Sequence, residues 1–480
     1  MKYYFYLFIS VLLLPLAVQA QQATSKSFIL EEAIAYALEN SVNAKNAKLD
    51  EEISKAKVRE ITGIGLPQID GSATVLHNQQ LGRFFAQYKG PEGFLGDLSG
   101  VPGLEEGDVV AAKNPFQLPS NGQAGISVTQ LLFNTSYLVG LKASRTYKDL
   151  SEKQSELTRQ QIIENVSKAY YGVIINSERI KLFDANIARV DSLFRSTKAF
   201  NENGFAESID VDRTEVTLNN LKAERDKFSS IQELGLNLLK FQMNYPLEMD
   251  IAVTGTIEDL RVDRDISSLA KDWDYTTRIE YSILETNRDL QDLNIKSKYS
   301  EGMPSLVAFA DFGMNTQSPN VSGIFKTNSS FEENSQLGRD KWYPTSSFGV
   351  SLNIPIFSGL QRNYRIQQEK LTALKIENSF TSLKQGISLE IKQGTLTYEN
   401  ALRSLDAQNR NMQLADKIAR VTKVKYEQGV GSSLEVTDAE SALREAQINY
   451  YNALYDALIS RIDLVKAYGK INTITETFKK

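Results

Sequence analysis

The side chains that carry most enzyme chemistry are scarce in this chain. Among its 480 residues there is no cysteine and a single histidine, His77. Without cysteine there is no thiolate nucleophile, no disulfide framework and no Cys-ligated metal site, and one histidine cannot form a two-histidine zinc site. His77 falls in an expected strand without a partner motif, and no GxxxxGK[ST] phosphate-binding loop occurs. We therefore expect no catalytic residue, no cofactor and no metal.

Two sets of charged residues share one spacing: a carboxylate, an arginine four residues later and a lysine three residues after that. They are Asp191, Arg195 and Lys198, and Asp416, Arg420 and Lys423. The spacing fits a helix-surface ion pair worth about 0.2–0.5 kcal/mol, and it also fits a ring of charges or a link between neighbouring helices. A secreted enzyme with two catalytic carboxylates is a further alternative. The 59 acidic residues, however, lie on helix faces that look solvated, and no pair stands out.

The positions of the 11 prolines predict where the long helices lie. None occurs in 120–245 or 356–480, and proline breaks helix interiors. Both stretches are rich in good helix formers, with apolar residues three or four apart. From Val436 to Ala467 the apolar spacing alternates between three and four, which predicts a coiled-coil seam. Segments 134–203 and 359–428, each of about 70 residues, would reach roughly 100 Å as helices.

Four further segments alternate apolar with small or polar residues and are predicted to be strands: 68–76, 123–132, 305–314 and 347–356. A length of about ten residues suits a tilted strand of a membrane barrel, although the alternation alone fits a soluble antiparallel sheet equally well. Segments 82–122 and 317–343 are expected to be long irregular loops, as on the outer face of membrane barrels.

The N-terminus resembles a secretory signal peptide. Lys2 gives a positive end, 3–18 is almost wholly apolar, and Val18-Gln19-Ala20 offers a cleavage site. The alternative, a membrane anchor, is disfavoured because the run is shorter than the roughly 20 residues of a spanning helix. With no cysteine after the site, a lipid anchor is not expected. The net charge of −5 and the lack of a basic tract predict no nucleic-acid partner.

The chain is predicted to hold two copies of one unit. Gly65-Leu66-Pro67 matches Gly302-Met303-Pro304, and at a shift of 225 residues Thr197 and Gly204 meet Thr422 and Gly429. After the signal peptide (1–20), the first repeat (21–270) is expected to contain helix 28–62, strands 66–78 and 123–133, and helices 135–203 and 207–245. The second repeat (271–480) is expected to contain helix 274–300, strands 304–315 and 346–357, and helices 359–428 and 433–468.

Four strands cannot close a barrel, because bacterial barrels begin at about eight and open strand edges cannot face lipid. On the assumption that three copies close cyclically, they give twelve strands. The fold expected on that assumption is a mixed α/β membrane protein, a homotrimer in which a long antiparallel helical coiled-coil barrel is continuous with a 12-stranded transmembrane β-barrel.

With these features the chain resembles the TolC-type outer-membrane efflux proteins. Leu30 to Ser41 is similar to the opening helix of that family, and 65–69 is similar to the start of its first strand. Tyr426-Glu427-Gln428-Gly429, followed by Leu434-Glu435-Val436, looks like its helix-reversal signature. The resemblance covers nearly the whole chain after the signal peptide.

The resemblance implies a passive channel in the outer membrane of a Gram-negative bacterium that extends into the periplasm. Its partners would be outer-membrane lipid, a periplasmic adaptor and an inner-membrane pump of the RND or ABC type, for drug efflux or type I secretion. The helix-reversal tips would dock on the adaptor, which places Asn203, Gly204, Phe205, Gln428, Gly429 and Val430 at that contact. A periplasmic coiled-coil adaptor without a barrel is the alternative, but it leaves the four strands unexplained.

Overall fold

The computed structural model describes residues 26–98, 100–114, 116–255, 262–271, 273–326, 328–329 and 341–476. The expected signal peptide (1–20) lies outside these ranges. The chain divides into two compact units. Unit 1 comprises Met1–Glu52, Leu150–Glu285 and Glu377–Lys480, and unit 2 comprises Ile53–Asp149 and Thr286–Ile376.

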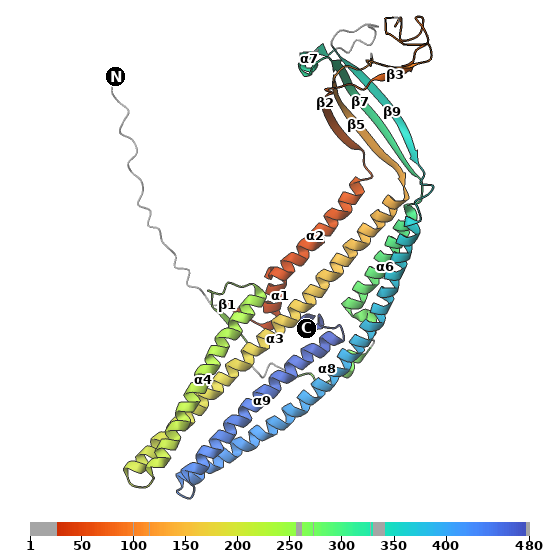
Figure 1. Cartoon of the computed structure of the whole chain (residues 1–480). Helices are drawn as coiled ribbons and strands as arrows, with labels where there is room; N and C mark the ends of the chain where they lie inside the picture. Colours follow the sequence, from red (N-terminus) through yellow and green to blue (C-terminus); the bar gives the residue numbers. More distant parts are fainter. Residues whose placement is uncertain are drawn as a thin grey trace, which may run out of the picture. The chain divides into compact units, whose positions relative to one another are not determined.

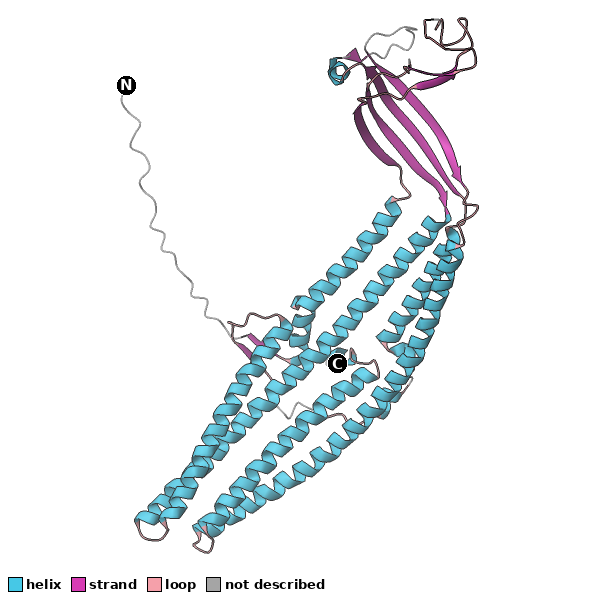
Figure 2. Ribbon diagram, in the orientation of Figure 1, coloured by secondary structure: helices cyan, strands magenta, loops and turns pink. Residues whose placement is uncertain are grey.

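Unit 1 consists mainly of two antiparallel helical hairpins (Figure 1 and Figure 2). The first hairpin pairs α3 (Thr135–Glu202) with α4 (Ser208–Met243), and the second pairs α8 (Gln361–Glu427) with α9 (Ser433–Ala467). These helices fill the proline-free stretches, where no proline removes a backbone donor. No helix in the described part of the chain is both long and apolar enough to cross a membrane.

The shorter elements of unit 1 surround the hairpins: β1 (Lys26–Phe28), α1 (Leu30–Asn40), the start of α2 (Val42–Gly63), β6 (Ile251–Val253), α5 (Ser267–Ala270), η2 (Tyr275–Thr277), the start of α6 (Ile279–Ser300) and α10 (Thr473–Glu476). The sequence predicts one helix over 28–62, but the chain breaks at Ser41, which is extended. The Ser41 Oγ accepts a hydrogen bond of 3.2 Å from the N–H of Ala44, so Ser41 ends α1 and caps α2.

The main core of unit 1 lies where α1, α3, α4, α9 and the β1–β6 pair meet. Ile34 of α1, Ile163 of α3 and Leu239 of α4 are almost fully buried there. The predicted seam of α9 is confirmed, because Val436, Leu443 and most seam positions to Ala467 are buried. Packing of these apolar stripes, rather than helix propensity, holds long helices in place.

Unit 2 is built around one sheet with the strand order β2 (Gln68–His77), β5 (Ser120–Asn134), β7 (Ser305–Ser318), β9 (Lys341–Asn353) and β8 (Asn328–Ser329). The four long strands are antiparallel, and β8 pairs in parallel with the first residues of β9. Figure 2 shows that these strands are curved. β9 contains Pro344, which stands opposite Met314, and it ends at Asn353, two residues before Pro355.

One strand departs from simple alternation. β5 has a register shift between Leu131 and Phe133, so Phe133 rather than Leu132 stands opposite Leu306 of β7. Strict alternation along 123–132 would place Leu132 on the same face as Ile126 and Val128, but the register shift gives that place to Phe133. An extra residue of this kind locally bends the strand.

The first long loop is more ordered than expected. It contains an antiparallel pair, β3 (Phe84–Gln87) and β4 (Val109–Ala112). Tyr88 follows β3 and is buried, and its backbone bonds to both Gly107 and Asp108. The second loop includes the short helix α7 (Val321–Lys326).

Candidate functional site: the exposed sheet and the helical tips

The two faces of the long-strand sheet differ sharply in polarity. One face, here called the apolar face, carries every second residue of each strand in register: Ile69 and Ala73 of β2, Ile126 and Val128 of β5, Phe312 and Met314 of β7, and Phe348 and Val350 of β9. Its large side chains are exposed, with Phe348 at 89% and Ile69 at 69%. An apolar surface of this extent marks an interaction site.

The opposite face, here called the polar face, carries the alternate residues. One row across it runs from Asp70 through Ser127 and Asp311 to Ser347. The Ser347 hydroxyl donates a hydrogen bond of 3.2 Å to the Asp311 carboxylate. The sheet is thus apolar on an exposed face and polar on the other, which is the alternation of a membrane strand.

Two glycines lie opposite each other at the centre of the sheet. Gly125 and Gly313 are direct partners on β5 and β7. A Cβ on Gly125 would lie 2.8 Å from the Phe312 carbonyl oxygen, and a Cβ on Gly313 would lie 2.9 Å from the Ala124 carbonyl oxygen. Close backbone approach therefore requires glycine at both positions.

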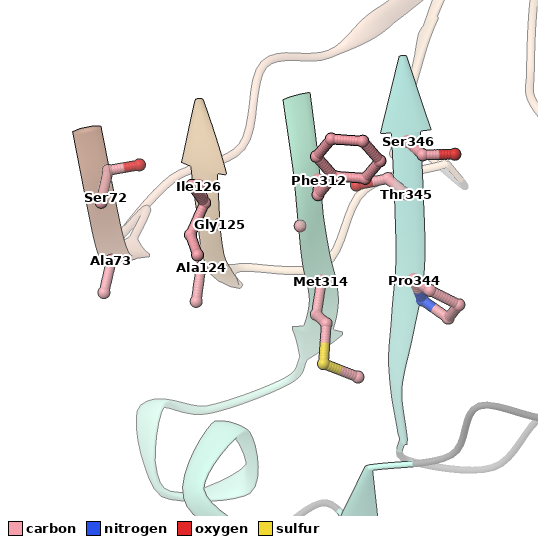
Figure 3. Close-up of a pocket in the computed structure, with 12 residues that line it drawn as sticks. Ser72, Ala73, Ala124, Gly125, Ile126, Phe312, Met314, Pro344, Thr345 and Ser346 are labelled. Carbon is pink, nitrogen blue, oxygen red and sulfur yellow. The ribbon is translucent and has the colours of Figure 1, made fainter. Parts of the chain in front are cut away.

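Three successive rows around these glycines line a hollow of about 820 Å³ (Figure 3). The row of Ala73, Ala124, Met314 and Pro344 spans all four long strands. The hollow is open and holds no convergent set of charged groups. Among the residues described, no group of three or more acidic or histidine side chains is placed to hold a metal ion.

The two hairpin tips close in the same way. Gly204 and Gly429 have φ of +80° and +72°. The N–H of the next residue, Phe205 or Val430, donates to a carbonyl five residues back, and the glycine N–H donates to one three residues back. This is the Schellman motif, in which glycine adopts the left-handed conformation at low cost.

The tips present apolar side chains outward. After a Schellman glycine the next residue usually packs against its own helix, but Phe205 is 84% exposed and Val430 77% exposed. Asn201 donates through Nδ2 to the Ala206 carbonyl oxygen at 2.8 Å, and Ser432 caps α9 by accepting from the N–H of Glu435 at 3.2 Å. The two tips are therefore rigidly turned while their apolar residues stay open.

The expected charged sets form the local ion pairs. Asp191 accepts from Arg195 Nε at 2.9 Å, and Asp416 pairs with Arg420 at 2.5 Å. Both arginine side chains are about three-quarters exposed. Lys198 is exposed, and Lys423 lies 3.8 Å from Glu427. Each pair stays within its own helix, so in one chain these residues do not link the two hairpins.

The link between the hairpins is made by other residues. Thr197 of α3 and Tyr426 of α8 are joined by a hydrogen bond, and Phe200 stacks edge-on against the Tyr426 ring. Farther from the tips, Asn186 donates to Gln447 at 3.1 Å, and Arg189 donates to the buried Glu440 at 3.3 Å. Sequence reasoning missed this polar contact between α3 and α9. The sequence feature that could have predicted this contact is the spacing of Glu440 and Gln447, two polar residues that lie seven positions apart beside an apolar seam.

A second network joins α3 to α9. Lys168 bonds to Glu164 at 2.8 Å and to Asp463 at 2.5 Å, and Lys466 bonds to Glu164 at 2.8 Å. Burial disfavours the charged form of Glu164, but hydrogen bonds from Lys168 and Lys466 outweigh burial and lower the pKa of its carboxyl. Glu164 is thus held ionised between two cations.

Arg278 is a nearly buried cation between α6 and the second hairpin. Its guanidinium, only 6% exposed, binds Glu280, Glu390 of α8 at 2.9 Å, and the Ala467 carbonyl oxygen at the end of α9 at 2.8 Å. Burial alone would lower the pKa of Arg278, but the two carboxylates raise it. One side chain therefore ties the start of α6 to both helices of the second hairpin.

Known proteins share this architecture. The outer membrane efflux protein family profile matches residues 287–470. The probable efflux pump outer membrane protein TtgC of Pseudomonas putida is 22% identical over 359 residues, which cover 72% of this chain and 68% of TtgC. Outer membrane protein TolC of Escherichia coli is 20% identical over 362 residues, covering 73% and 69%.

The fold agrees with these matches. The crystal structure of the outer membrane protein VceC from Vibrio cholerae superposes with a TM-score of 0.67 at 13% identity, covering 92% of this chain and 96% of VceC. That likeness extends over both the helical hairpins and the long strands. The matched profile over residues 287–470, the relatives and the shared fold make this chain similar to the TolC-type outer membrane efflux proteins, a family of passive channels and not of enzymes.

Proposed function

We propose that this chain is the outer-membrane channel of a tripartite export system, in which it passively conducts substrates from an inner-membrane pump and a periplasmic adaptor to the cell exterior. The observation that carries the proposal is the exposed apolar face of the four long strands, opposite a polar face. A sheet of this kind suits a wall with lipid on one side and water on the other. A periplasmic adaptor without a barrel has no use for such a surface.

The two ends of the sheet support assembly from several copies. In the described residues β2 pairs only with β5, and β9 from Tyr343 onward pairs only with β7. Unpaired backbone groups cannot face lipid, because each costs several kcal/mol there. Three copies, joined β2 to β9, would bring twelve long strands into a closed barrel, and the repeated order of helix, strand, strand, helix and helix in each half supports a duplicated unit.

We assign the adaptor contact to the hairpin tips. Phe205 and Val430 are apolar, exposed and held by glycine turns, so a pocket of a partner can bury them, as interface anchors are buried. Asn203, Gly204, Gln428 and Gly429 set the direction of those anchors. The charged sets around Asp191 and Asp416 lie on the same helices within three to four turns of the tips, which suits a ring near the periplasmic aperture.

The class of pump and the kind of cargo are proposed only in general terms. Relatives named as antibiotic and toluene efflux pump components favour export of small toxic compounds, for which we propose an RND-type pump. A relative named as an alkaline protease secretion protein keeps type I secretion with an ABC-type pump as the alternative. A duct contacts its cargo weakly, so neither choice rests on a particular residue.

The test is the mass of the detergent-purified protein by light scattering, corrected for bound detergent, followed by conductance in a planar bilayer. Three protomers per particle and discrete conductance steps are the expected results. A particle that is monomeric and soluble without detergent would overturn the proposal.

A further inference from the structure

The short helix α7 lies on the apolar face of the sheet, at the end next to the long loops. Its Ile324 is 1% exposed. A Cβ on Gly122 of β5 would lie 2.9 Å from Ile324, from Thr316 of β7 and from the ring of Trp342 of β9. The Trp342 indole donates a hydrogen bond of 3.2 Å to the Ile324 carbonyl oxygen. Because Gly122 belongs to the row of Val75 and Thr316, α7 covers that row.

The outer side of α7 is apolar as well. Val321 and Phe325 are four residues apart and so share one helix face, and both are exposed, Phe325 at 74%. The helix start is fixed by Asn320, whose Oδ1 accepts from the Gly323 N–H and the Ser322 hydroxyl, both at 2.9 Å. A six-residue helix with a firmly packed inner side thus holds a phenylalanine outward.

The height of α7 on the sheet can be calculated. The apolar face begins at the row of Phe133, Leu306 and Leu352 and ends at the row of Gly122 and Thr316. Ten residues of β7 separate these rows, which is about 34 Å along the strand. At a tilt of 35–45° this corresponds to roughly 24–28 Å along the barrel axis, and the apolar band of an outer-membrane barrel is about 25 Å tall.

We infer that α7 is an interfacial anchor: it lies at the outer lipid–water boundary, where Val321 and Phe325 contact the lipid of the outer leaflet and Trp342 braces the helix from below. The inference rests on the proposed function, because it requires that the apolar face contacts lipid. Two features select lipid as the occupant: α7 is continuous with the apolar face, and it lies at the edge of a band of bilayer thickness. Amphipathic aromatic and apolar groups favour that boundary.

The chain has no cysteine, so single-cysteine variants of the full chain can be labelled at one place. We would label Phe325→Cys, Val321→Cys, Phe348→Cys and Phe205→Cys with bimane and purify the trimer-sized particle. Each would be reconstituted in phosphatidylethanolamine–phosphatidylglycerol vesicles that contain doxyl lipids with the nitroxide near the headgroup or deep in the chain. Phe348 lies mid-band on the apolar face, and Phe205 lies on a hairpin tip.

The label at 325 or 321 should be quenched more by the shallow nitroxide than by the deep one, the label at 348 should show the reverse, and the label at 205 should not be quenched. Quenching at 348 but at neither 325 nor 321 would overturn the inference and leave the channel proposal standing. The same holds if the cysteines at 325 form disulfides between copies. No quenching at 348 would overturn the lipid-facing sheet and the anchor together.

Discussion

The phenol oxygen of Tyr426 lies 3.1 Å from Oγ1 of Thr197, although 229 residues separate them in the chain. Thr197 is completely buried, and the ring of Tyr426 also contacts Phe200 edge-on. One tyrosine therefore holds the tip-proximal parts of α3 and α8 together through a polar and an aromatic contact.

Replacing Tyr426 by Phe should loosen the tips without unfolding the protein. The ring contact with Phe200 is kept, but the hydrogen bond is lost, at a cost of about 0.5–1.5 kcal/mol. Backbone amides near residues 195–203 and 420–428 should exchange up to about tenfold faster in hydrogen-exchange mass spectrometry. Tyr147→Phe, at an exposed tyrosine of α3, is the control. Equal exchange in wild type and Tyr426→Phe would show that the hydroxyl contact does not restrain the tips.

Replacing Gly429 should impair export while the trimer persists. Proline cannot adopt a φ of +72°, and it would also remove the N–H that donates to the Tyr426 carbonyl oxygen at 3.0 Å. Gly429→Pro, and a bulky residue at Gly204, should therefore disorder the tips and reduce resistance to a toxic export substrate in cells. Gly386→Ala is the matched control, because it lies inside α8 with open space at its Cβ. Full resistance in cells that carry Gly429→Pro would show that this tip is not part of the adaptor-docking surface.

Much of this architecture follows from local sequence signals. Proline-free stretches and the glycines at 204 and 429 indicate the long helices and their reversals, because both signals act within a few residues. The break at Ser41 was readable in principle, since Asn40-Ser41 is a capping sequence, but residues that favour helices continue on both sides of it.

Contacts between distant segments are not encoded in this way. The pairing of Thr197 with Tyr426, or of Arg189 with Glu440, depends on which faces of α3, α8 and α9 meet, and many faces carry compatible residues. The two short strands in the first loop pair Phe84 with Ala112, and no periodic pattern in the sequence predicts that pairing. The apolar residues of one sheet face, by contrast, follow from alternation along each strand outside the register shift of β5, although alternation does not show that this face is exposed.

Removal of the buried cation Arg278 should be destabilising. Arg278→Ala leaves Glu280 and Glu390 without their partner and the Ala467 carbonyl oxygen without a donor. The side chains of Glu280 and Glu390 are 29% and 42% exposed, so water solvates them once the arginine is gone, and the loss should be smaller than the about 3–5 kcal/mol of a fully buried pair. Arg264→Ala is the matched control, because its partner Asp406 and its own side chain are exposed, and such pairs contribute about 0–1 kcal/mol. The midpoint of thermal unfolding, followed by circular dichroism of the helices, should fall more for Arg278→Ala than for Arg264→Ala. Equal midpoints for the two variants would show that Arg278 adds nothing beyond an exposed ion pair.

The Glu164 network should make helix packing sensitive to acid. The pKa of Glu164 is lowered from its ordinary value of 4.5, so its contribution to stability is fully present above about pH 4.5 and is lost as the pH falls through the lower folded-state pKa. The raised pKa of Lys168 has the opposite sign, and its contribution is lost only as the pH rises past 10.5. The midpoint difference between wild type and Glu164→Gln should therefore be largest at pH 6–9 and shrink by pH 3. A difference that stays constant with pH would exclude the ionised carboxylate as its source.

The glycine pair of the sheet should be required for strand packing. Alanine at Gly125 would place its Cβ 2.8 Å from the Phe312 carbonyl oxygen and 3.0 Å from the Gly313 Cα. Both neighbours are backbone atoms that cannot rotate away, and overpacking of this kind costs about 1–3 kcal/mol. Gly71→Ala is the matched control, because it is also a strand glycine on the same hollow but has nothing within 4 Å of its Cβ. The yield of heat-resistant oligomer on a mild detergent gel should fall for Gly125→Ala and not for Gly71→Ala. Equal yields would mean that the strands can separate at this row without loss of assembly, and close backbone approach at Gly125 and Gly313 would then not be required for the oligomer.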